Sequence, residues 1–131
     1  MQTLLNLLYH PRLGFVILRW SVAGLMLLHG LSKLLNGVAG IAGMLGQAGL
    51  PPYLAYGVFV GEVLAPLLVI VGWFVGPAAL VMALNMVVAI ALAHTGELFT
   101  LGKSGGWALE LQGLFLFGSL AIALMAPPKK R

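Results

Sequence analysis

Eight polar side chains interrupt otherwise apolar stretches of this sequence, and they are the groups that could do chemistry. They are Arg19, His29, Lys33, Glu62, Asn85, His94, Glu110 and Gln112. Together they offer cationic donors, carboxylate acceptors, two amides and two imidazoles. Such a set suits a lipophilic molecule with a polar head, because it can hydrogen-bond the head and exchange protons with it. We take these eight residues as the candidate ligand-binding site.

The residues give less support to other chemistries. The chain has no cysteine, and its histidines and glutamates lack metal-ligand spacing, so no metal site is predicted. His29 and His94 could ligate a haem axially, but both fall near the mouth of the expected bundle and no second histidine pair exists. Hydrolase chemistry is disfavoured because the chain has no aspartate, no phosphate-binding loop and no serine in an elbow motif.

The composition identifies the elements that must position these groups. Of 131 residues, 61% are hydrophobic and 8% are charged, against about 45–50% and about 25% in soluble domains. A membrane-spanning helix needs about 20 apolar residues, so the chain can supply four. The net charge of +4 rests on seven basic and three acidic residues. That is too few for a surface that follows phosphates, so no nucleic-acid partner is expected.

Four apolar runs are long enough to cross a bilayer. The sequence therefore predicts an all-α, integral membrane four-helix bundle that forms a single membrane domain over residues 1–131. The expected spans cover about residues 13–35, 54–73, 77–94 and 106–126. Between the first two spans, Val38, Ile41, Leu45 and Ala48 follow helical spacing, which predicts a short interfacial helix over the outer mouth.

Basic residues near the span ends predict the orientation. Arg12 and the Lys129-Lys130-Arg131 tail lie on one side, whereas Lys33 and Lys103 lie toward the other. Because basic residues are enriched on the cytoplasmic side, both termini are expected to be cytoplasmic.

Most of the polar groups are expected in the outer half of the bundle. At about 1.5 Å per residue, His29 and Glu110 lie about 6 Å below the outer ends of their helices, and Gln112 lies about 9 Å below. Glu62 and Asn85 lie about 12–14 Å below, in a pocket opening to the outer leaflet.

Two further features bear on this pocket. Arg19 is deeper, about 21 Å from the outer side, and its long stem could reach toward Glu62 or snorkel to the cytoplasmic interface. Pro66 cannot donate a hydrogen bond to the Glu62 carbonyl, so we expect a kink that widens the pocket beside this carboxylate.

An ordered set of residues resembles the DoxX family of small bacterial inner-membrane proteins. The set comprises Arg19 with Gly24, the run from His29 to Lys33, Gly49-Leu50-Pro51, Gly61-Glu62, Gly72, Asn85-Met86, Ala89, His94, Gly105-Gly106-Trp107 and Glu110. The resemblance spans about residues 14–126 and implies a multi-pass protein of the bacterial inner membrane. It also implies a link to quinone-coupled redox, sulfur oxidation or resistance to oxidants.

A quinone suits the candidate site chemically. Its carbonyls need donors such as His29, Lys33 or Arg19, and its quinol form needs an acceptor such as Glu62 or Glu110. The first hypothesis is a quinone- or lipophile-binding membrane subunit that is not catalytic alone and works with a redox partner protein or as a homo-oligomer. The second is a scaffold or assembly protein whose polar network only holds the helices together. The third is a small transporter or proton path.

Overall fold

The computed structural model describes residues 1–128 and is helical throughout its regular elements. Its α-helices are α1 (Gln2–Leu8), α2 (Pro11–Asn36), α3 (Ala39–Gln47), α4 (Ala65–Val71), α5 (Val75–Ala93) and α6 (Glu110–Met125). Shorter segments are the 3-10 helices η1 (Pro52–Gly57) and η3 (Thr95–Glu97) and the π-helix η2 (Val60–Leu64). Within the described residues there is no strand, only an isolated bridge between Leu101 and Trp107. The all-α prediction is confirmed.

Three helical segments are long and apolar enough to cross a membrane. They are α2, the segment Pro52–Val71 that joins η1, η2 and α4, and α5. Helix α6 is also apolar but has only 16 residues. Its length is about 24 Å, which is shorter than the hydrocarbon core of about 30 Å. Large apolar side chains point outward, as lipid contact requires; Leu28, Leu84 and Leu114 are 62%, 62% and 71% exposed. The chain is therefore a membrane protein with three spans by length and a shorter apolar helix.

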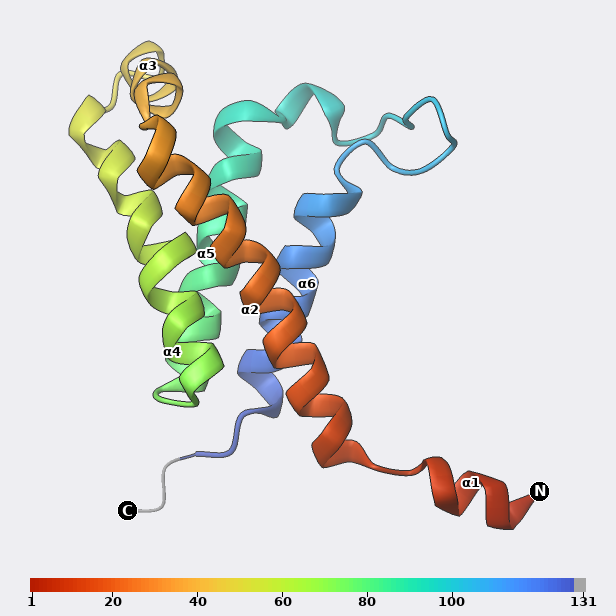
Figure 1. Ribbon diagram of the computed structural model, residues 1–131. Coiled ribbons are helices and arrows are strands. Elements are labelled where there is room, and N and C mark those ends of the chain that lie inside the picture. The colour runs from red at the N-terminus through yellow and green to blue at the C-terminus, as the bar shows by residue number, and fades with distance from the viewer. Residues whose placement is uncertain (129–131) are drawn as a thin grey trace.

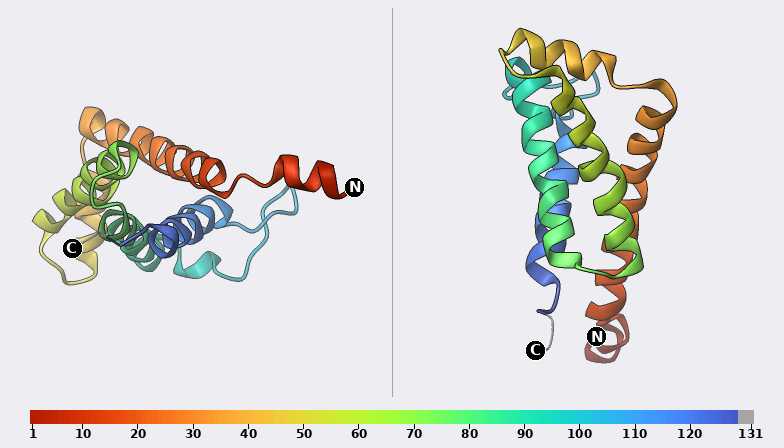
Figure 2. Two further views of the ribbon diagram at one scale, coloured as in Figure 1. Left: turned by 90° about the horizontal axis from the view of Figure 1, so that it is seen from below. Right: turned by 90° about the vertical axis from the view of Figure 1, so that its left-hand side faces the viewer.

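The long segments pack side by side around a narrow core. Helix α2 contacts α4 and α6, and α5 contacts the same two helices from the opposite side (Figures 1 and 2). Ala23, Met26, Met82 and Ile122 meet in the interior, where each is buried. The small side chain of Ala23 and the unbranched ones of Met26 and Met82 allow the helices to approach closely.

The two ends of the molecule differ in what covers them. At one end, here called the α3 end, the short helix α3 lies across the tops of η1 and α5 and buries Leu45 (Figure 1). At the other, the terminal end, α1 extends away from the bundle with no buried residue. The last residues of α6 lie at this same end (Figure 1). The predicted basic tail, Lys129-Lys130-Arg131, lies outside the described residues.

Proline and glycine mark the helix boundaries at the terminal end. Pro11 occupies the first turn of α2, where its missing N–H leaves no hydrogen bond unmade. Gly72 closes α4 with a left-handed φ of +92°, and the N–H groups of Gly72 and Trp73 both donate to the Leu68 carbonyl. A glycine suits this position because a Cβ disfavours the left-handed conformation.

Candidate functional site

Glu62 is a buried charged residue at the centre of a polar cluster. It is 3% exposed, and it carries a formal charge inside a membrane helix. The Lys33 ammonium donates to Glu62 Oε2 at 2.6 Å, and the Asn85 side-chain amide donates to Glu62 Oε1 at 3.2 Å. Three segments, α2, η2 and α5, therefore meet at one carboxylate whose two oxygens each have a partner.

A local change in helix geometry presents Glu62 to these partners. The π-helical turn Val60–Leu64 contains Glu62, and the Ala65 N–H donates to the Val60 carbonyl five residues back. Pro66 follows directly, and it cannot donate to the Glu62 carbonyl four residues back. The expected disturbance beside Pro66 thus takes the form of a π-turn, a feature that is frequent at functional sites.

Two glycines allow the neighbouring helices to come close to η2. A Cβ added at Gly30 would overlap the Glu62 backbone carbonyl, so α2 packs directly on the π-turn. A Cβ at Gly61 would lie 2.6 Å from Asn85 Cβ and Cγ. Both glycines were part of the resemblance, Gly30 within the run from His29 to Lys33, but sequence reasoning missed that Gly30 allows this close contact. The sequence feature that could have indicated this role is the position of Gly30 within a helix, on the same face as Lys33.

A cavity of about 550 Å³ opens beside this ion pair. Residues of α3, η1, η2 and α5 form its walls, which are mostly apolar. Its polar lining consists of Lys33, Glu62, Asn85 and His94. The volume is within the range of about 300–1,000 Å³ that small-molecule sites occupy, and a few polar groups among apolar walls are typical of them. We call it the Glu62 cavity.

His94 links the Glu62 cavity to a second polar cluster at the α3 end. Its Nε2 lies 3.4 Å from Gln112 Nε2, and its Nδ1 lies 3.4 Å from Glu97 Oε2. Because the Gln112 amide nitrogen is a donor, this arrangement requires Nε2 to accept and Nδ1 to carry a proton.

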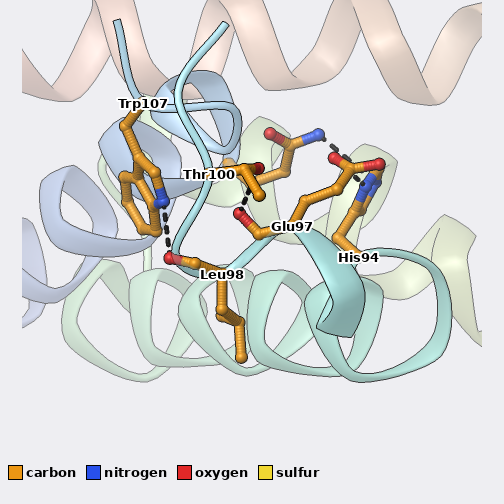
Figure 3. Close-up of polar contacts among 6 residues, drawn as sticks. His94, Glu97, Leu98, Thr100 and Trp107 are labelled. Atoms are coloured by element: carbon orange, nitrogen blue, oxygen red, sulfur yellow. Dashed lines mark hydrogen bonds and ion pairs between the residues drawn. The ribbon is translucent and has the colours of Figure 1, made fainter.

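The Trp107 indole donates to the Leu98 carbonyl at 2.8 Å and thereby ties the loop after α5 to the start of α6 (Figure 3).

The remaining sequence-predicted residues lie elsewhere. His29 packs edge to face on Phe115, with ring centroids 5.6 Å apart, and so faces α6. Glu110 is exposed in the first turn of α6, where the helix dipole favours a negative charge. Arg19 lines a different cavity at the terminal end, whereas Lys33 is the residue that pairs with Glu62.

Of the eight candidates, the structure brings four together around one cavity: Lys33, Glu62, Asn85 and His94. Gln112 reaches this group through His94. Among residues 1–128, no three histidine, aspartate or glutamate side chains gather as metal ligands.

These features define a small helical membrane protein with a buried, hydrogen-bonded ion pair beside an apolar cavity. The DoxX family model matches residues 14–95, more than half of the chain. The chain belongs to the DoxX family. The matched region contains all four polar residues of the Glu62 cavity and ends before Glu110 and Gln112. No curated protein and no solved structure matches the chain.

Proposed function

We propose that this DoxX-family protein binds a lipophilic molecule with a carbonyl or hydroxyl head, of the quinone and quinol class, in the Glu62 cavity. The observation that carries the proposal is the Glu62 carboxylate, 3% exposed and held by Lys33 and Asn85 at the edge of an apolar space of about 550 Å³. A charge in a membrane helix is costly and is usually retained for function.

The donor set fits both redox forms of such a ligand. The side chain of Lys33 is 32% exposed, so its ammonium has N–H groups free to turn toward a quinone carbonyl. Glu62 accepts hydrogen bonds and can take one from a quinol hydroxyl, while the Asn85 amide can donate or accept. The apolar walls of η1 and α5 suit an isoprenoid or alkyl tail.

The protein would supply binding and proton exchange rather than electron transfer. The chain has no cysteine, and its residues suggest no flavin-binding or haem-binding motif, so electrons would come from a redox partner protein in the bacterial inner membrane. We therefore assign it the role of a membrane subunit that is not catalytic alone and that acts in redox or oxidative-stress chemistry.

The same proposal treats α6 as the fourth span of a four-helix bundle, with both termini cytoplasmic. Helix α6 packs along α5 and α2, and its length of about 24 Å can be accommodated by local bilayer thinning. Trp107 precedes its first turn, and tryptophan is enriched at the membrane interface.

Titration of the detergent-purified full chain with decylubiquinone and with its quinol form, by isothermal calorimetry, tests the proposal. We expect saturable binding that Glu62→Gln weakens by about tenfold, as loss of a charge-assisted hydrogen bond should. Glu110→Gln is the matched control, because Glu110 is exposed in the first turn of α6 and outside the cavity lining. No saturable binding, or equal binding by both variants, would contradict the proposal.

A structural role is the second candidate, and one observation favours it. The Lys33–Glu62–Asn85 group joins three helical segments, as a polar network that only holds a bundle together would. That role predicts that Glu62→Gln lowers the unfolding temperature and that neither ligand form raises it. Ligand binding instead predicts a concentration-dependent rise, because a ligand that binds only the folded state stabilises it.

A further inference from the structure

The terminal end contains a second and larger cavity with a different character. It has a volume of about 1,210 Å³ and lies between the start of α2, the α4–α5 connection and the end of α6. Arg12 and Arg19 line it. Of the described residues in its lining, none is acidic. We call it the arginine cavity.

Arg12 and Arg19 present two positive charges to the same space. They are seven residues apart on α2, which places them on one face of the helix and about 10 Å apart along its axis. The Arg19 guanidinium carbon lies 5.9 Å from the Phe15 ring centroid. The Arg19 Nε is buried and has no hydrogen-bond partner within residues 1–128. A buried N–H of this kind needs an acceptor.

The acidic side chains of the protein are engaged or positioned far from this cavity. The chain has three. Glu62 pairs with Lys33 and Glu97 lies beside His94, both toward the α3 end. Glu110 begins α6, whereas the cavity is lined by the last residues of that helix, about 22 Å further along its axis. The anion that would balance Arg19 must therefore come from outside these side chains.

The surroundings of Arg19 leave room for such an anion. The Arg19 guanidinium lies over Gly72, which has no side chain. A Cβ added at Gly72 would be 3.6 Å from a terminal nitrogen of Arg19. The cavity also has apolar and aromatic walls, which include Phe15, Trp73 and Met125. A guanidinium matches the oxygens of a phosphate group well, and apolar walls suit acyl chains.

We propose that the arginine cavity binds the phosphate headgroup of an anionic phospholipid, with Arg19 as the principal donor and Arg12 as the second cation. Basic pockets between membrane helices are a recognised setting for acidic headgroups. The site is separate from the Glu62 cavity, so it does not depend on the proposed binding of a quinone. With both termini cytoplasmic, as proposed, the lipid would belong to the cytoplasmic leaflet.

Native mass spectrometry of the full chain in mixed micelles tests this proposal. The probes are dioleoyl-phosphatidylglycerol and, as the zwitterionic comparison, dioleoyl-phosphatidylcholine. We expect one phosphatidylglycerol molecule to be retained in preference to phosphatidylcholine. Arg19→Gln should weaken this retention by roughly tenfold or more, as loss of a charge-assisted hydrogen bond predicts. Arg19→Lys keeps the charge and should lose less.

Two further variants separate binding from folding. Lys103→Gln removes an exposed cation from the loop after α5, outside the cavity lining, and should leave retention unchanged. Arg12→Gln alters an exposed residue and should weaken retention even if Arg19→Gln fails to fold. Equal retention of the two lipids, or no loss in Arg12→Gln and Arg19→Gln, overturns the proposal. Binding of inorganic phosphate as tight as that of phosphatidylglycerol overturns the assignment to a lipid.

Discussion

The ion pair between Lys33 and Glu62 allows a quantitative prediction about stability. The Glu62 side chain is 4% exposed and that of Lys33 is 32% exposed. Removing one partner of a fully buried pair costs about 3–5 kcal/mol, since it leaves an uncompensated charge. Because Lys33 is partly exposed, the lost interaction is closer to a hydrogen bond to a charged group, about 1.5–3 kcal/mol. We therefore expect Lys33→Met to destabilise the fold by about 2 kcal/mol.

The double variant Lys33→Met with Glu62→Gln should recover much of this loss. It removes both charges together, and the new amide can still accept the hydrogen bond from Asn85, which now lies 3.2 Å from Glu62 Oε1. Replacing a buried pair by neutral groups of similar size is often close to neutral. We expect the double variant to be within about 1 kcal/mol of the unaltered protein.

Thermal unfolding in one detergent, followed by circular dichroism, measures both effects. For a chain of this size, about 2 kcal/mol corresponds to a fall in Tm of roughly 8 °C. Lys103→Met is the matched control, because Lys103 is exposed in a loop, and its Tm should not change. The reasoning is refuted if Lys33→Met is as stable as this control. It is also refuted if the double variant is less stable than Lys33→Met alone.

Three further predictions concern packing and backbone geometry. Gly30→Ala should destabilise the fold by about 1–3 kcal/mol, because its Cβ would overlap the π-turn. Gly24→Ala should be neutral or stabilising, because its Cβ would meet nothing within 4 Å. Thermal unfolding of the two variants compares their stabilities. Trp107→Phe removes the bond to Leu98 and should speed proteolysis of the loop after α5, with an unchanged rate contradicting the expected anchor. Gly72→Ala should lower Tm by the equivalent of about 1–2 kcal/mol, and an unchanged Tm would show that no strain arises at φ +92°.

Composition and spacing predicted much of the fold. Apolar runs that cover the hydrocarbon thickness identify membrane helices because hydropathy is a local property of the chain. The helical spacing after Asn36 predicted a short helix, and α3 covers residues 39–47. Pro66 signalled a disturbance beside Glu62 because a proline removes a helical hydrogen bond. The start of α6 was less evident, since the loop residues directly before it, Gly106 to Leu109, are apolar as well.

Which polar groups meet was decided only by the tertiary structure. Arg19 and Lys33 lie on one face of α2, so the sequence allowed either to approach Glu62. They are about 21 Å apart along the helix. Helix α2 packs on η2 at the level of Lys33, so Lys33 is the residue that pairs with Glu62. Arg19 faces the arginine cavity instead.

The sequence by itself determined that the protein is helical, that it belongs in a membrane and which few residues carry charge there. These properties depend on the residue types along each segment. The pairing of Lys33 with Glu62 and Asn85, and the separation of His29 and Arg19 from that group, depend on how each helix is rotated and how far it is shifted along its neighbours. Both quantities come from packing between segments distant in sequence, including the close contact of Gly30 with the π-turn.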